Sequence, residues 1–156
     1  MSPSLQAELV QRKPFSSAEH EAVLSIARTA AVLEHGMAEA LKEHGLTPTQ
    51  YNALRILRGA GQEGLCRNEV RDRLIARVPD TTRLLDRLAE MGLVVRAREG
   101  EDRRFVRTRI TRAGLELIAP LDAVMTALHR RQLGHLGREQ LRRLIELLED
   151  ARATAE

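Results

Sequence analysis

The sequence PDTTRLLDRLAEMGLVVRAREGEDRRFVRTRI, residues 79–110, contains the change of period that decides the fold. Its first half is helical in period, with leucines at core spacing: Leu84, Leu85 and Leu88. Gly92 follows where such a helix would end. Residues 94–99 and 105–110 instead alternate apolar and polar side chains, as paired strands do, and a polar tip, 100–104, separates them. The stretch therefore predicts a helix followed directly by a β-hairpin.

A second short helix is predicted just before this one. Asn68 is a residue type that caps helices, and an apolar periodicity runs from there to about Ala76 through Val70, Leu74 and Ile75. Residues 76–78 form a tight turn, and Pro79 suits the first position of the next helix. Two short helices joined by a tight turn form a helix-turn-helix, whose second helix enters the major groove of DNA. A hairpin directly after that helix would be a wing.

The clearest boundary signal lies upstream, at the start of another helix. Thr47, Pro48 and Gln50 combine a capping box with a proline at the first helical position. Leu46 and Tyr51 stand at the two positions of a hydrophobic staple. Glycines at positions 59 and 61 end this helix.

Both ends of the chain are predicted to form longer helices. Residues 16–44 begin with a capping-box pattern at Ser16 and Glu19, and their apolar positions exceed one narrow stripe. Residues 112–153 follow a cap at Thr111, with a kink expected at Pro120 and a break between glycines 134 and 137. The helix that follows Thr111 has apolar residues that include Leu115 and Val124. These helices carry more apolar surface than one small winged domain could bury, which favours packing against a second subunit.

Composition limits the remaining choices. The 156 residues fit one globular domain, and 43% hydrophobic content with 30% charge is typical of a folded protein. A single cysteine excludes an intrachain disulfide and a cysteine-based zinc site. No apolar run is long enough for a membrane span, and the N-terminus lacks a signal-peptide core, so we expect a cytoplasmic protein with no membrane partner.

Positive charge is concentrated in one third of the chain. Residues 67–112 contain 13 Arg and 8 acidic residues, a net charge of +5, whereas the whole chain carries +3. Everything outside this segment is therefore slightly acidic. A local excess of arginine on a helix-turn-helix segment is typical of a protein whose partner is a polyanion.

The stretch from 46 to 114 resembles the MarR family of winged-helix regulators (multiple antibiotic resistance regulators). The resemblance rests on four ordered segments: LTPTQYNALRIL, NEVRDRL, TTRLLDRLAEMGLVVR and EDRRFVRTRITRAG. Its most specific part combines six positions: Asp102, Arg103, Arg104, Ile110, Thr111 and Gly114. The flanking helices match the family in placement, so the resemblance covers nearly all the chain.

This resemblance implies a mainly α fold with a small β-hairpin wing, in one domain over 1–156. Residues 46–111 would form the winged helix-turn-helix lobe, and 16–44 and 112–153 would intertwine with a second subunit as dimerisation helices. It also implies a homodimeric bacterial regulator bound to double-stranded operator DNA, with no cofactor. Family members often release DNA when a small anionic or aromatic effector enters the junction between the dimer helices and the DNA-binding lobe.

The candidate DNA-binding residues come from both predicted helices and from the wing: Asn68, Pro79, Asp80, Thr81, Thr82, Arg83, Arg87, Asp102, Arg103 and Arg104. Arginine grips phosphate or reads guanine edges, and threonine can meet a phosphate or a thymine methyl. On the wing, Arg104 would enter a narrow minor groove while Asp102 orients an arginine.

Each of these residues also has a plainer interpretation. Arg83 and Arg87 would suit a solvated helix face, with Arg87 associated with Asp86 or Glu90, and the two threonines could simply pack in the first turn. The family often has Ser or Thr where this chain has Pro79 and Asp80. That departure matters because a carboxylate repels phosphate, so Asp80 would have to face a cytosine amino group or point away.

Position alone nominates four effector-binding residues on helices that line the family's pocket: His35, Tyr51, Arg55 and Met125. Each equally fits a place in the core or the subunit interface. Cys66 fits a small buried hydrophobe better than a redox switch, and the family's oxidation-sensing members use a cysteine near the chain start that is missing here. The five histidines give no metal-ligand spacing, so no metal site is predicted.

The leading hypothesis is thus a dimeric repressor that binds a specific DNA sequence and leaves it when an effector binds. A winged-helix module that contacts proteins, without operator binding, is the alternative, although its wing and second helix would not need basic residues. Nothing indicates an enzyme, because the chain has no phosphate-binding loop, nucleophile elbow or metal-ligand motif. The sequence does not specify the effector, the operator, or repression as opposed to activation.

Overall fold

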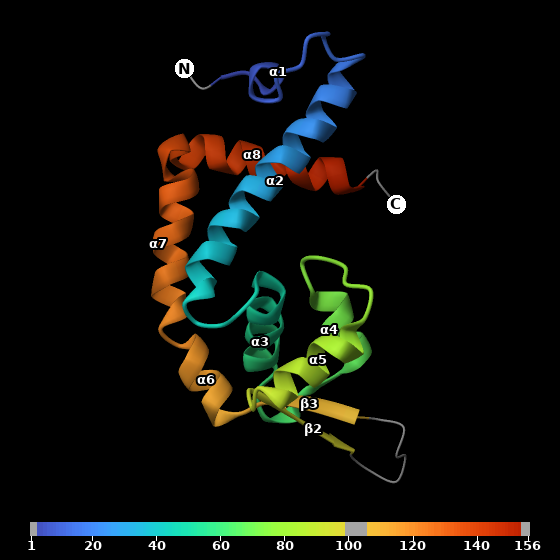
Figure 1. Ribbon diagram of the computed structural model, residues 1–156, viewed down its shortest axis with the longest axis vertical. Coiled ribbons are helices and arrows are strands. Elements are labelled where there is room, and N and C mark those ends of the chain that lie inside the picture. Colours follow the sequence, from blue (N-terminus) through green and yellow to red (C-terminus); the bar gives the residue numbers. More distant parts are fainter. Residues whose placement is uncertain (1–2, 99–105, 154–156) are drawn as a thin grey trace.

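The computed structural model describes residues 3–98 and 106–153, which fold as helices around a small sheet (Figure 1). The helices are α1 (Leu5–Glu8), α2 (Ala18–Lys42), α3 (Pro48–Ala60), α4 (Arg67–Arg73), α5 (Thr81–Glu90), α6 (Arg112–Ile118), α7 (Leu121–Leu133) and α8 (Gly137–Ala153). The strands are β1 (Leu65–Cys66), β2 (Val94–Arg98) and β3 (Val106–Ile110). Two short 3₁₀ helices, Gly61–Glu63 and Gly134–Leu136, complete the order. The mainly helical fold with a β-hairpin after the second short helix is confirmed.

The lower lobe in Figure 1 contains the helix-turn-helix, α4 and α5, and the sheet beneath it. The sheet is antiparallel in the order β1-β3-β2, and Val94 lies opposite Ile110 at its inner end. The sequence analysis predicted only the two strands of the hairpin, and Leu65 lies outside them. The structure pairs it with Thr108 of β3, which adds a third strand to the predicted hairpin.

An aliphatic core fixes the position of α5 in this lobe. Leu85 and Leu88 are completely buried, and they belong to the same core cluster as Leu54 and Leu57 of α3. Full burial of a leucine side chain contributes about 1.5–3 kcal/mol, so this inward face dominates the placement of the helix. The opposite face of α5 is left to solvent.

The predicted capping signals are largely confirmed. Thr47 Oγ1 accepts the Gln50 backbone N–H at 3.2 Å, while Gln50 returns a bond to the Thr47 backbone N–H at 3.0 Å. Gly92 has a φ of +73° and ends α5, and the next N–H, of Leu93, reaches back to the Leu88 carbonyl. The cap of α2 was misplaced by one residue, because Ser17 rather than Ser16 accepts the first-turn N–H.

Three local expectations in the helix-turn-helix are wrong. Residue Cys66, not Asn68, is the N-cap of α4, because β1 pairing holds the chain extended up to that point. The helix also stops at Arg73, so Ile75 is 89% exposed instead of facing inward. Pro79 is outside α5, and Asp80 is its N-cap.

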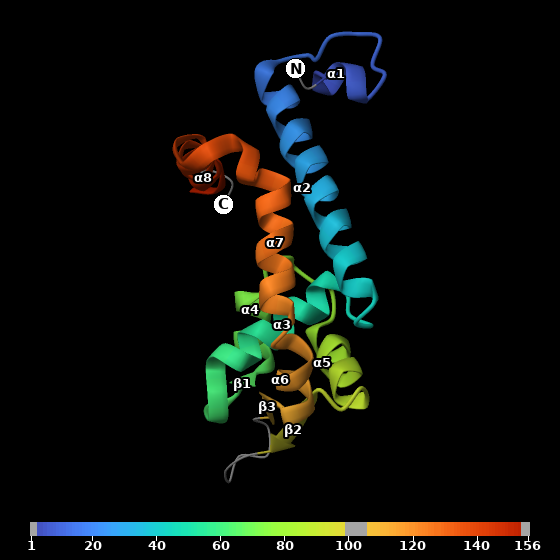
Figure 2. The ribbon, with the colours of Figure 1, turned by 90° about the vertical axis from the view of Figure 1, so that its left-hand side faces the viewer.

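The upper part of the molecule consists of α2 and α7 side by side, and α8 runs off at a steep angle from the end of α7 (Figures 1 and 2). The helix predicted to bend at Pro120 is divided there into α6 and α7. The side chain of Gln132 on α7 donates to the Leu33 carbonyl at 3.1 Å, across a close approach at Gly36.

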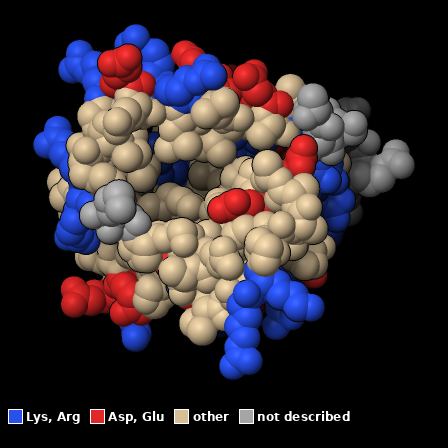
Figure 3. Space-filling model, turned by 90° about the horizontal axis from the view of Figure 1, so that it is seen from above, with Lys and Arg blue, Asp and Glu red and all other residues tan. Residues whose placement is uncertain are grey.

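Most of this upper part is not buried by the chain itself. In α2 only Leu41 is buried, and no residue of α8 is. The large apolar side chains exposed on these two helices are Val23, Ile26, Val32, Ile145 and Leu147. Leu115 and Val124, two apolar positions of the helix predicted after Thr111, are 41% and 37% exposed. Seen from above, this end of the molecule is largely uncharged, with most basic side chains at its rim (Figure 3).

Candidate nucleic-acid interface

The exposed face of α5 is lined by alternating charges. A shallow depression of about 580 Å³ lies along it and is bordered by Asp80, Thr82, Arg83, Asp86, Arg87 and Glu90. The side chains of Leu85 and Leu88 occupy the opposite, buried side. An amphipathic helix held in this way presents its polar side chains at fixed positions to a partner.

The start of α5 assigns different roles to neighbouring residues. The Asp80 side chain accepts the Arg83 backbone N–H at 3.0 Å, which uses the carboxylate as a helix cap. Thr81 is only 6% exposed, so it packs inward, whereas Thr82 is half-buried at the rim of the depression. Of the predicted first-turn contacts, Thr82 is thus the more accessible to a ligand on this face.

The arginines of this surface differ in their partners. Arg87 Nη1 lies 3.1 Å from a Glu90 carboxylate oxygen, one of the two associations foreseen from sequence. Arg96, on β2, forms an ion pair with Asp86. Arg83 is exposed and makes no ion pair within residues 3–98 and 106–153. Sequence patterns gave no sign that a strand arginine reaches α5, because strand and helix are brought together only by the turn at Gly92.

The start of α4 is tied to α5 by one arginine. Arg67 Nη1 donates to Thr82 Oγ1 at 3.5 Å, and its Nη2 donates to the Asn68 side chain at 3.4 Å. The Cys66 backbone N–H donates to Glu69 at 2.8 Å, and this bond is the main reason that the pKa of Glu69 is lowered. Asn68 therefore lies beside the α5 surface even though it does not cap the helix.

The wing is described only along its strands. Arg107 donates to the Gly64 carbonyl at 3.1 Å and lies 3.8 Å from Glu69, which fastens β3 to the start of the helix-turn-helix. The predicted wing-tip residues Asp102, Arg103 and Arg104 lie outside the described residues. The strands position the hairpin directly beside α5 (Figure 1).

The four nominated effector residues divide into two groups. Tyr51 and Met125 are each only 4% exposed and belong to the core cluster. Arg55 is exposed, and its guanidinium carbon lies 6.0 Å from the centre of the Tyr51 ring. Burial is the main cause of a raised pKa at Tyr51. His35 is exposed on α2 and is not drawn into this group by any contact.

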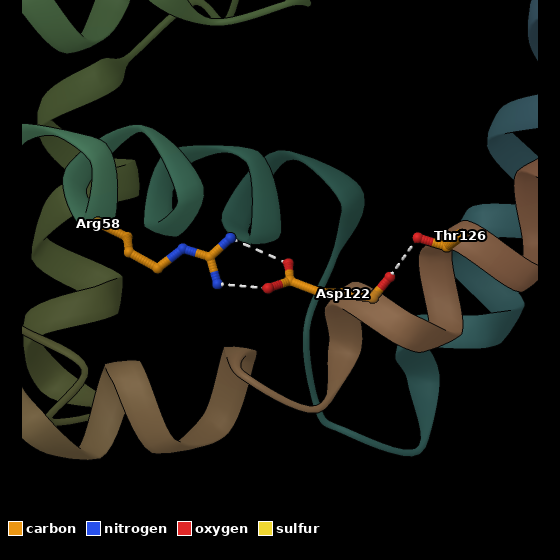
Figure 4. Close-up of polar contacts among 3 residues, drawn as sticks. All are labelled: Arg58, Asp122 and Thr126. Atoms are coloured by element: carbon orange, nitrogen blue, oxygen red, sulfur yellow. Dashed lines mark hydrogen bonds and ion pairs between the residues drawn. The ribbon is translucent and has the colours of Figure 1, made fainter.

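An ion pair missed by sequence analysis joins the lobe to the upper helices at this junction. Arg58 on α3 holds Asp122 on α7 through two hydrogen bonds of 2.9 Å, and Thr126 donates to the Asp122 carbonyl (Figure 4). The Arg58 hydrogen bonds lower the pKa of Asp122. Neither residue carries a motif, since exposed Arg and Asp are common at such positions. They become partners only because the fold brings Arg58 of α3 close to the start of α7.

Two further features bear on what the site can do. Within the part of the chain that the structure describes, no group of three or more His, Cys, Asp or Glu side chains is placed to hold a metal ion. Over the same residues, no helix is both long enough and apolar enough to cross a membrane. Cys66 is half-buried beside the helix-turn-helix.

The fold and the charged α5 surface define a winged helix-turn-helix DNA-binding protein. The profile of the MarR family matches residues 44–104. The HTH-type transcriptional repressor IacR of Pseudomonas putida is 31% identical over 124 residues, covering 80% of this chain and 73% of the relative. The chain belongs to the MarR family of transcriptional regulators.

Solved structures agree with this assignment. The crystal structure of a MarR transcription factor from Planctomyces limnophilus is 41% identical, with a TM-score of 0.67, over 87% of this chain and 98% of that one. The organohalide-sensing regulator RdhR, in its 2,4-dichlorophenol-bound form, shares the fold at a TM-score of 0.82. That match has 15% identity and covers 94% of this chain and 88% of that chain. The protein is thus a sequence-specific DNA-binding transcriptional regulator, in a family of transcription factors rather than enzymes.

Proposed function

We propose that this regulator is a homodimeric repressor that binds operator DNA with α5 and the wing and is released by a small effector. The observation that carries the proposal is the outward face of α5. There Arg83 and Arg87 stand opposite a fully buried leucine face, the arrangement with which recognition helices enter a major groove. A repressor of bacterial operators acts in the cytoplasm.

DNA contact is assigned to three elements of the lobe. The α5 residues assigned to the major groove are Thr82, Arg83 and Arg87. From α4, Asn68 is assigned to the sugar-phosphate backbone of the DNA. On the wing, Arg103 and Arg104 contact phosphate or a narrow minor groove, and Asp102 orients an arginine. Pro79 and Asp80 shape the first turn of α5, since Asp80 is engaged as its cap.

The dimer is supported by the apolar surface that one chain leaves exposed. Val23 is 64%, Val32 54% and Ile145 56% exposed on helices that bury almost nothing within the chain. We assign 16–44 and 112–153 to the subunit interface, apart from α6, which packs with the lobe. Analytical sedimentation at micromolar concentration is expected to give a dimer, and a stable folded monomer would contradict the assignment.

The effector is assigned to the junction of α2, α3 and α7. A buried phenol at Tyr51 beside an exposed guanidinium at Arg55 suits a small aromatic or anionic molecule. Met125 would add apolar contact, and His35 is exposed on α2. The fold neighbour RdhR was solved with 2,4-dichlorophenol, which supports a ligand of this kind. A binding titration with phenols and aromatic carboxylates, in which Arg55→Ala weakens only the carboxylates, tests the assignment.

The DNA-binding proposal is tested by comparing arginines of the wing and the helix. Wild type, Arg83→Ala and Arg104→Ala are titrated at two salt concentrations against a duplex selected by the wild type from random sequences and against a scrambled duplex. A phosphate contact at Arg104 predicts weaker binding to both duplexes and a salt slope shallower by about 0.9. A base contact at Arg83 predicts a loss of about 1–3 kcal/mol confined to the selected duplex. Failure of the wild type to select any duplex would favour a protein-interaction role instead.

A further inference from the structure

The outer face of α5 is not basic, although its segment of the chain is. Three carboxylates, Asp80, Asp86 and Glu90, and two guanidinium groups, Arg83 and Arg87, border the depression, so its formal charge is −1. The surrounding stretch 67–112 has a net charge of +5. The basic residues on either side of α5 therefore attract an approaching DNA backbone, which meets carboxylates at α5 itself.

These carboxylates are also paired with the arginines that could otherwise grip phosphate. Glu90 holds Arg87 at 3.1 Å, and Asp86 holds Arg96, whose side chain is only 20% exposed. Asp80 is occupied as a helix cap, and Arg83 makes no ion pair among the described residues. Among the described residues, Arg83 is thus without a carboxylate partner, whereas Arg87 and Arg96 each have one.

Pairing of this kind acts differently on matched and unmatched DNA. On any sequence, a phosphate that approaches a paired arginine also meets the neighbouring carboxylate, so the attraction is partly cancelled by a like charge. On a matched sequence, a carboxylate can accept a hydrogen bond from a cytosine amino group, and an arginine can bind guanine, so the repulsion is offset. Discrimination between two partners can come from repulsion of the wrong one as well as attraction of the right one.

We propose that Asp86 and Glu90 are specificity-determining residues, which keep Arg87 and Arg96 from generic phosphate contacts. The recognition helix then binds firmly only where Arg83 and the carboxylates meet matching bases, a half-site containing G·C pairs. The inference rests on the proposed DNA-binding function, and it deepens that function by assigning selectivity to two acidic residues of the recognition helix.

The test uses the full-length protein with Glu90→Gln and Asp86→Asn. Both are titrated against the duplex selected by the wild type and a scrambled duplex of the same composition, at two salt concentrations. Glu116→Gln is the matched control, because the Glu116 side chain is 65% exposed, against 66% for Glu90, and is also paired with an arginine on its own helix, away from α5. Thermal melting of each variant checks that the fold is retained.

Release of Arg87 or Arg96 is expected to tighten binding to the scrambled duplex about threefold or more, and to steepen its salt slope by about 0.9. Binding to the selected duplex changes less, so the ratio of the two affinities falls for both variants and not for Glu116→Gln. Unchanged affinity for the scrambled duplex in both variants, or equal weakening on both duplexes, would overturn the inference. A wild type with no preference between the duplexes would instead refute the proposed function.

Discussion

Thr111 joins the end of α5 to the start of α6 through one hydroxyl group. Its Oγ1 accepts the Gly114 backbone N–H at 3.1 Å, which caps α6, and donates to the Gly92 carbonyl at 2.7 Å, where α5 turns into β2. Replacement by alanine removes a cap worth about 1 kcal/mol. It also removes a second hydrogen bond worth about 1 kcal/mol. We therefore expect Thr111→Ala to lower the free energy of unfolding by about 2 kcal/mol.

The assay is equilibrium denaturation in urea at one fixed protein concentration, because dimerisation would make the midpoint concentration-dependent. Thr47→Ala is the internal comparison, since the Thr47 side chain only caps α3 and should cost about 1 kcal/mol. Thr111→Ser keeps both bonds and should stay within about 0.5 kcal/mol of wild type. Equal losses for Thr111→Ala and Thr47→Ala would show that the bond to Gly92 contributes nothing to stability, which would contradict the prediction.

Two further predictions concern packing and pH. A Cβ at Gly114 would collide with the Leu93 carbonyl oxygen, so Gly114→Ala should lower the free energy of unfolding by about 1–3 kcal/mol. A Cβ at Gly59 meets nothing within 4 Å, so Gly59→Ala should raise it by about 0.4–1 kcal/mol. Urea denaturation measures the free energy of unfolding of both variants, and a change of the same sign in the two would contradict the prediction. Because Arg58 lowers the pKa of Asp122, their pair stabilises above the ordinary value of 3.8, and the contribution is lost as pH falls through the lower folded pKa. Asp122→Asn should therefore be less stable than wild type at neutral pH and approach it in acid, and a difference independent of pH would argue against the pair.

Local sequence signals predicted the elements of the lobe because the responsible residues act on their own neighbours. The capping box at Thr47, the glycine at position 92 and the alternation after Leu93 each depend on a few adjacent residues, and each was found where expected. The burial of Leu85 and Leu88 likewise follows from helical period alone. These features suffice to define the helix-turn-helix and its wing.

The errors occurred where a distant partner overrides a local preference. Asn68 is a good capping residue, yet pairing of β1 with β3 moves the cap to Cys66. Ile75 continues a helical stripe, but the helix ends earlier, and the Ile75 backbone N–H is bound by the side chain of Asn52, 23 residues away. A periodic pattern carries no information about such long-range bonds.

In the candidate site, too, the features that depend on local sequence were predictable and those that depend on distant partners were not. Arg83 and Arg87 were nominated from their place on a predicted recognition helix, and both are exposed on α5. The pairing of Asp86 with Arg96 and the bridge from Arg58 to Asp122 could not be predicted, because each joins two elements whose contact arises only in the fold.

The central claim, that two symmetry-related α5 helices read one operator, is tested most directly by a hydroxyl-radical footprint. The wild-type protein is bound to the duplex it selects from random sequences, and cleavage is mapped on both strands. We expect two protected stretches of a pseudo-palindrome, related by twofold symmetry and centred about 10 base pairs apart, one turn of the double helix. Protection of a single asymmetric half-site, or no protection at a concentration that saturates binding, would contradict it.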